Sequence, residues 1–125
     1  MVTYDFAIPV RTPTLNELLR MHFRLRAKTA QSLAWQVRSS AMPPAKPIQA
    51  CNVIIERTSP REPDPDGLNS CGKIIMDILQ PCSLRHPMGL GFIADDSSKC
   101  VRNFQVRHIN GRDPRTRIII QEVTP

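Results

Sequence analysis

The alternation of hydrophobic and polar positions predicts a strand and then a helical region near the N-terminus. Residues 3–9 alternate in part between polar and apolar side chains, which is typical of a β-strand. Thr14 followed by Glu17 is a capping-box pattern that marks a helix start. The apolar stripe that continues toward Ser40 consists of Leu15, Leu18, Leu19, Phe23, Leu33, Ala34 and Val37. The pattern leaves open one long helix or two pieces broken near residues 24–28.

The middle of the chain predicts a strand, a stiff loop and a second helix. Residues 48–58 are rich in β-branched side chains and predict the strand. Residues 59–67 are rich in proline and predict the loop. Apolar residues at helical spacing predict a helix at about residues 68–79, with Asp66 or a neighbour near its N-cap.

Two strands are expected in the last part of the chain, at about residues 101–109 and 115–123. Asn110-Gly111 between them is a strong hairpin signal. The expected element order is therefore β-α-β-α-β-β. It predicts an α+β fold, with a small mixed β-sheet and helices packed against it. Residues 1–125 are expected to form a single domain with one modest core.

Charge and composition narrow the class of partner. The chain has 17 Lys+Arg against 11 Asp+Glu, and a net charge of +6 indicates an anionic partner, most commonly nucleic acid. A generic solvated basic surface explains the charge equally well. No apolar run approaches the ~20 residues that span a bilayer, and the N-terminus does not resemble a secretory signal. We therefore expect a cytoplasmic protein with no membrane partner.

The four cysteines form no C-x-x-C pair of the kind that structural zinc sites use. We expect them to be reduced, small hydrophobic residues, mostly buried. A zinc-stabilised domain is an alternative, and its ligands would be Cys71, Cys82, Cys100 and His86.

Several of the few acids lie close together in sequence. Asp64 and Asp66 precede the second predicted helix, and the pair Asp95-Asp96 precedes the next strand. A hard cation such as Mg²⁺, which binds one or two carboxylates together with phosphates, would offset their mutual repulsion. An acidic pocket within a basic surface is what a metal-dependent nuclease needs.

Each part of this acidic pattern also has a structural interpretation. On a helical wheel Asp66, Lys73 and Asp77 fall within about 40° of one another, yet Lys73 and Asp77 are equally an ordinary solvent-exposed i,i+4 pair. Asp64 and Asp66 suit a turn or a helix cap. Asp95-Asp96 likewise suits a turn before a strand.

These motifs together resemble the RusA family of Holliday-junction resolvases. The resemblance rests on Asp64-Pro65-Asp66-Gly67-Leu68, on Lys73 to Leu79, and on Gly91 to Ser97. Pro13 to Asn16, with Arg20 and His22, is also similar to the family's opening after its first strand. The chain departs from the family pattern at Gly67, where the family has asparagine, and in a spacing to Lys73 three residues longer than in the best-known member.

The resemblance implies a homodimeric, magnesium-dependent endonuclease that nicks four-way DNA junctions symmetrically, in recombination and repair. By position it implies catalytic roles for Asp64, Asp66, Lys73 and Asp96, with the three aspartates as metal ligands. Asp95 is a weaker, supporting candidate.

The expected DNA contacts come from basic residues. The main candidates are Arg20, Arg24, Arg26, Lys28, Arg57 and Arg61. The alternative to the nuclease is a non-catalytic, basic nucleic-acid-binding α/β domain, in which the carboxylates act as caps and turns.

Overall fold

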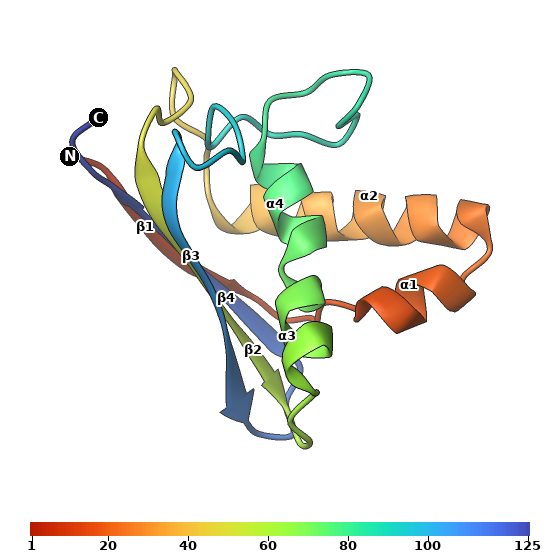
Figure 1. Ribbon diagram of the computed structural model, residues 1–125. Coiled ribbons are helices and arrows are strands. Elements are labelled where there is room, and N and C mark those ends of the chain that lie inside the picture. The colour runs from red at the N-terminus through yellow and green to blue at the C-terminus, as the bar shows by residue number, and fades with distance from the viewer.

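The computed structural model describes all 125 residues and consists of one four-stranded sheet with helices gathered on one face (Figure 1). This arrangement confirms the predicted α+β class with a small mixed sheet. The elements in chain order are β1 (Thr3–Ile8), α1 (Leu15–Arg20), α2 (Phe23–Ser40), β2 (Cys51–Ser59), α3 (Pro65–Cys71), α4 (Lys73–Leu79), β3 (Val101–Asn110) and β4 (Arg115–Glu122). None of the helices is both long and apolar enough to cross a bilayer.

The sheet has the strand order β1-β4-β2-β3, with β2 parallel to β3 and the other pairs antiparallel. The predicted hairpin at Asn110-Gly111 is therefore wrong, because β2 lies between the two strands that this dipeptide joins. The connection instead crosses the end of β2, where the Gly111 N–H donates to the Ser59 carbonyl at 3.2 Å. A Cβ at position 111 would lie 2.8 Å from the Thr58 methyl group, so glycine is needed here for close approach.

The first helical region is two helices, and the break lies at Met21 and His22, earlier than residues 24–28. The predicted capping box starts α1: the Glu17 N–H donates to Thr14 Oγ1 at 3.2 Å, and Glu17 Oε1 accepts from the Thr14 N–H at 3.3 Å. His22 starts α2, because its Nδ1 accepts from the Arg24 N–H at 3.2 Å.

The second predicted helix also divides in two, at Gly72. It begins earlier than expected, since Asp64 is the N-cap of α3 and accepts from the Gly67 N–H at 2.7 Å. Gly72 is buried against the sheet, and a Cβ there would lie 2.7 Å from Val106 Cγ2 and 2.8 Å from Phe104 Cζ. The missing side chain lets the α3–α4 pair approach β3 closely.

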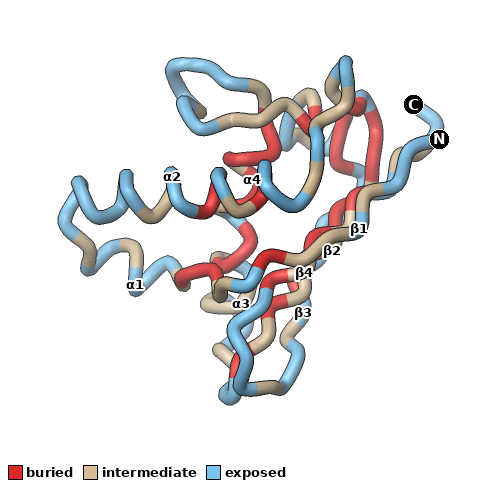
Figure 2. The backbone as a smooth tube through the Cα atoms, turned by 180° about the vertical axis from the view of Figure 1, so that it is seen from behind, coloured by how far each residue is buried: buried red, intermediate tan, exposed pale blue.

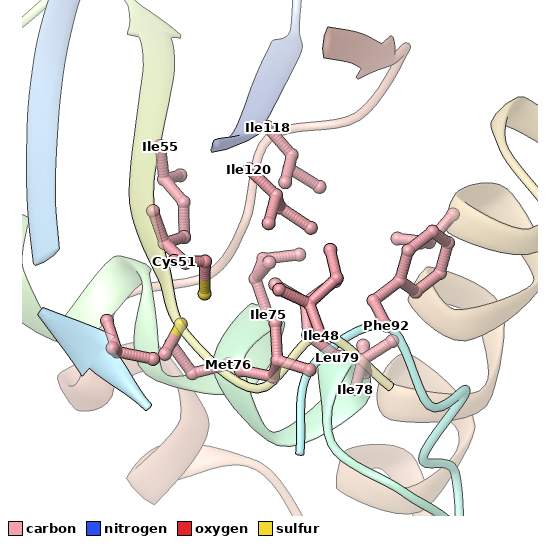
Figure 3. Close-up of a cluster of buried hydrophobic side chains, with 14 of the residues drawn as sticks. Ile48, Cys51, Ile55, Ile75, Met76, Ile78, Leu79, Phe92, Ile118 and Ile120 are labelled. Atoms are coloured by element: carbon pink, nitrogen blue, oxygen red, sulfur yellow. The ribbon is translucent and has the colours of Figure 1, made fainter. Parts of the chain in front are cut away.

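The core lies between the helices and one face of the sheet, where buried segments from both layers meet (Figure 2). The apolar face predicted for the second helix is confirmed, since Ile75, Ile78 and Leu79 are fully or almost fully buried. Figure 3 shows these side chains gathered with Phe92 opposite the isoleucines of β4. Phe92 also contacts β1, with its ring centroid 5.1 Å from that of Tyr4.

The opposite face of the sheet carries a row of charges instead of a second helical layer. Arg117 on β4 donates to Asp5 on β1 at 2.8 and 2.6 Å, and to Glu56 on β2 at 3.0 Å. Arg107 on β3 lies 3.8 Å from the same glutamate. Opposite charges on neighbouring strands thus offset one another across all four strands.

Ile120 and Ile119 of β4 offer a matched test of which face forms the core. Ile120 is fully buried, whereas Ile119 points to the other face and is half-buried. Ile120→Ala should lower the free energy of unfolding by about 2–5 kcal/mol, because it leaves a cavity in the core. Ile119→Ala should lower it clearly less. Urea unfolding of both variants measures the difference, and equal losses would contradict the one-sided core.

The ion pair between Asp5 and Arg117 predicts a specific acid sensitivity. The hydrogen bond from Arg117 lowers the pKa of Asp5. The stabilisation is therefore fully present above the unfolded-state pKa and is lost as the pH falls through the lower folded-state pKa. Asp5→Asn should destabilise the protein at pH 7 and have little effect near pH 2. Urea midpoints at the two pH values provide the measurement, and an effect that is the same at both would exclude the ion pair as its source.

Candidate functional site

The first two predicted site residues lie at the start of α3. Asp64 caps the helix through its bond with the Gly67 N–H, and Asp66 is exposed in the first turn. Asp64 lines a hollow that also includes Leu68 and Asn69. A carboxylate at this end of a helix is stabilised by the unpaired N–H groups. Asp64 therefore already has a structural role, although its second carboxylate oxygen makes no hydrogen bond within the chain.

The other two predicted catalytic residues share a second hollow, of about 510 Å³, between α4 and the entry to β3. Lys73 contributes from the first turn of α4, and Asp96 contributes from the loop before β3. Its remaining lining residues are Asn69, Ser70, Met76, Asp77, Ser98, Val101 and Phe104. Asn69 lines both hollows, so the two are neighbours across α3.

Asp77 is the acid in this second hollow that the sequence-based site assignment omitted. Burial raises the pKa of Asp77, and the nearby Asp96 raises it further, although His86 and Lys73 act in the opposite direction. His86 Nδ1 lies 3.7 Å from an Asp77 carboxylate oxygen. The sequence did contain a signal for including Asp77 in the site. Asp77 follows Lys73 by four residues and falls on the helix face that also holds Asp66.

Asp95 is placed as a turn residue. One of its carboxylate oxygens accepts from the Asp96 N–H at 2.8 Å. Hydrogen bonds from Ser97 and from that N–H lower the pKa of Asp95. This local bonding orders the loop and so helps to fix the position of Asp96.

No group of three or more His, Cys, Asp or Glu side chains is close enough in the structure to hold a metal ion. A three-aspartate metal site made of Asp64, Asp66 and Asp96 therefore remains a prediction. The four residues of the zinc alternative, Cys71, Cys82, Cys100 and His86, likewise form no such group in the structure. All four cysteines are free, and only Cys82 is exposed. Burial and the neighbouring Cys100 raise the pKa of Cys51 to about 12, as expected for an unreactive core thiol.

The basic residues predicted to contact DNA divide into two groups. Arg61 and the four candidates on α1 and α2 are exposed, and none of them makes an ion pair within the chain. Arg57 is buried with only 5% of its surface exposed, and its Nε donates to the Thr12 carbonyl at 2.8 Å. The predicted DNA contact of Arg57 is therefore wrong, because its guanidinium ties β2 to the segment before α1.

Comparison of the sequence with protein-family models and with curated proteins gives no match. The relation to RusA resolvases therefore stays a resemblance carried by the motifs.

The arrangement around Asp77 predicts how its pKa responds to its neighbours. Asp96→Asn should lower the pKa of Asp77, because it removes a like charge, and Lys73→Met should raise it, because it removes an opposite charge. NMR titration of the Asp77 carboxyl carbon measures both shifts. Asp113→Asn, in the loop after β3, is the control and should leave the pKa unchanged. Unshifted values in both test variants would contradict the shared hollow.

Proposed function

We propose that the protein is a magnesium-dependent, structure-specific endodeoxyribonuclease that resolves four-way DNA junctions by paired, symmetric nicks. The observation that carries the proposal is the hollow shared by Lys73, Asp77 and Asp96, next to the helix start that bears Asp64 and Asp66. The exposed, unpaired basic residues on α1 and α2 and the motif resemblance to RusA resolvases support it.

The donors of this hollow suit magnesium in type and number. Asp96 raises the pKa of Asp77, so the two carboxylates repel, and a cation near them would relieve this repulsion. Magnesium is usually held by one or two carboxylates together with waters and substrate phosphates. Asp96 and Asp77 would hold one ion from this hollow, and Asp64 and Asp66 would hold a second ion at the neighbouring helix start, so that each ion would take two protein carboxylates. When bound, the ions would supply an activated water and offset charge on the scissile phosphate.

The residues of the chain would position the DNA around that centre. The Lys73 ammonium, exposed at the start of α4, would bind a non-bridging oxygen of the scissile phosphate. Two copies related by a two-fold axis would present two such sites to opposing strands of a junction, which itself has two-fold character.

One observation favours the alternative of a non-catalytic nucleic-acid-binding domain. Asp64 caps α3, and Asp95 orders a turn, so two of the proposed site carboxylates have sufficient structural reasons to be present. In that alternative magnesium would not matter, and the basic surface alone would bind DNA.

Cleavage of a synthetic four-way junction, with Mg²⁺ or with EDTA, separates the two functions. The wild type should cut only with Mg²⁺. Asp66→Asn and Asp96→Asn should each slow cutting by at least about 100-fold, because even the partners of metal ligands are worth 10- to 100-fold. Both variants should bind the junction as well as the wild type or more tightly, since each removes a negative charge near phosphate.

Asp113→Asn serves as the matched control, because it removes one exposed carboxylate in the loop between β3 and β4. It should cut at the wild-type rate. Junction binding without cutting under all conditions would favour the binding domain. Full activity of Asp66→Asn would refute the site assignment.

A further inference from the structure

The connection between α1 and α2 forms a corner that lies away from the sheet, at the far end of the helical layer (Figures 1 and 2). We call His22, Phe23 and Arg24 the α1–α2 corner. All three residues are exposed, and 63% of the Phe23 surface is accessible to solvent. Phe23 is not among the hydrophobic residues packed against the core. An exposed aromatic ring at this position is not explained by folding.

The two rings at the corner lie close together and are tilted relative to each other. The His22 and Phe23 ring centroids are 4.4 Å apart, with their planes inclined by 34°. The Arg24 guanidinium carbon lies 5.8 Å from the Phe23 centroid, within reach of a cation–π contact. The helix cap fixes His22, since its Nδ1 accepts from the Arg24 N–H. The corner therefore presents a partly ordered aromatic and cationic surface.

The positive charge around the corner indicates which kind of partner it binds. No Asp or Glu occurs between Glu17 and Glu56. The basic residues in that stretch are all exposed and are Arg20, Arg24, Arg26, Lys28, Arg38 and Lys46. None of them makes an ion pair within the chain. Two such surfaces would repel each other, so charge complementarity favours a polyanion over a second copy of this chain.

We propose that the α1–α2 corner binds an unstacked nucleobase of branched DNA, with the Phe23 ring as the stacking surface and the surrounding cations on the flanking phosphates. Aromatic rings and arginine planes bind unstacked bases in this way, and the contact is tolerant of sequence. At a branch point, bases that end a helical arm can lose a stacking neighbour, whereas those within a continuous duplex keep both. The proposal rests on the proposed function for its DNA substrate.

The position of the corner fits a substrate that also occupies the candidate site. The start of α1 is held next to α3, because the Leu15 N–H donates to Ser70 Oγ at 3.1 Å, and Ser70 lines the hollow of Lys73. The helix α1 spans about 9 Å at 1.5 Å per residue. This length corresponds to about three nucleotide steps of 3.4 Å. The hollow of Lys73 therefore lies by the start of α1, and the corner lies at the end of that helix.

The test compares variants of Phe23 in binding to a four-way junction and to a linear duplex of the same sequence, with EDTA present so that no cutting occurs. Phe23→Leu keeps an apolar side chain and removes the aromatic face. It should weaken junction binding by about 5- to 150-fold, the range that one stacked base accounts for. It should leave duplex binding unchanged. Phe23→Trp should retain the junction affinity.

Leu19→Ala is the matched control, because Leu19 is also 63% exposed and lies on the neighbouring helix. It should bind both DNAs as the wild type does. A direct readout is available because Trp35 is the single tryptophan of the chain. In the Trp35→Phe background, Phe23→Trp makes the corner the only source of tryptophan fluorescence. The junction should quench this fluorescence, and the duplex should not.

Wild-type junction affinity in Phe23→Leu would overturn the inference and leave the proposed function intact. Equal losses on junction and duplex, or a matching loss in Leu19→Ala, would also overturn it, in favour of general apolar docking. Dissociation of a dimer by Phe23→Leu in sedimentation velocity would assign the corner to a second copy instead. A wild-type protein that binds neither DNA would refute the proposed function itself.

Discussion

The close approach of Gly72 to the sheet is the constraint on which the rest of the candidate site depends. The α3–α4 pair contacts Val106 and Phe104 at this point, where any larger side chain would meet them. The apolar run forms two short helices that meet at this residue, and each short helix contributes part of the site. The start of α3 carries Asp64 and Asp66, and α4 carries Lys73 and Asp77.

The residues that stabilise the fold and the basic residues proposed to bind DNA lie on different faces of the protein. Stability comes mainly from the core between the helices and the sheet, and the far face of the sheet is stabilised by the charges that surround Arg117. The unpaired cations lie on the opposite side, on α1 and α2. This separation allows basic residues on α2 to be replaced without disturbing the core. Arg57 is the exception, because it is inside the protein and holds the Thr12 carbonyl.

Local sequence rules predicted the strands, the capping box and the buried side of α4, because neighbouring residues determine those features. They failed where a distant segment decided the outcome. Asn110-Gly111 has hairpin chemistry, but β2 occupies the space between the strands it joins. The burial of Arg57 could have been predicted, since it has the same strand phase as Val53 and Ile55. The grouping of Asp77 with Asp96 could not have been predicted from the sequence, because it depends on how the loop before β3 folds back onto α4.

The strand order has a consequence for how the chain is assembled on the ribosome. The C-terminal strand β4 lies between β1 and β2, so it joins the N-terminal strand to the rest of the sheet. Until β4 has emerged, β1 has no partner strand, and β2 can pair only with β3. Nascent chains that lack β4 would expose unpaired strand edges, which favour aggregation. A truncation as short as this one strand would therefore separate the sheet into two parts.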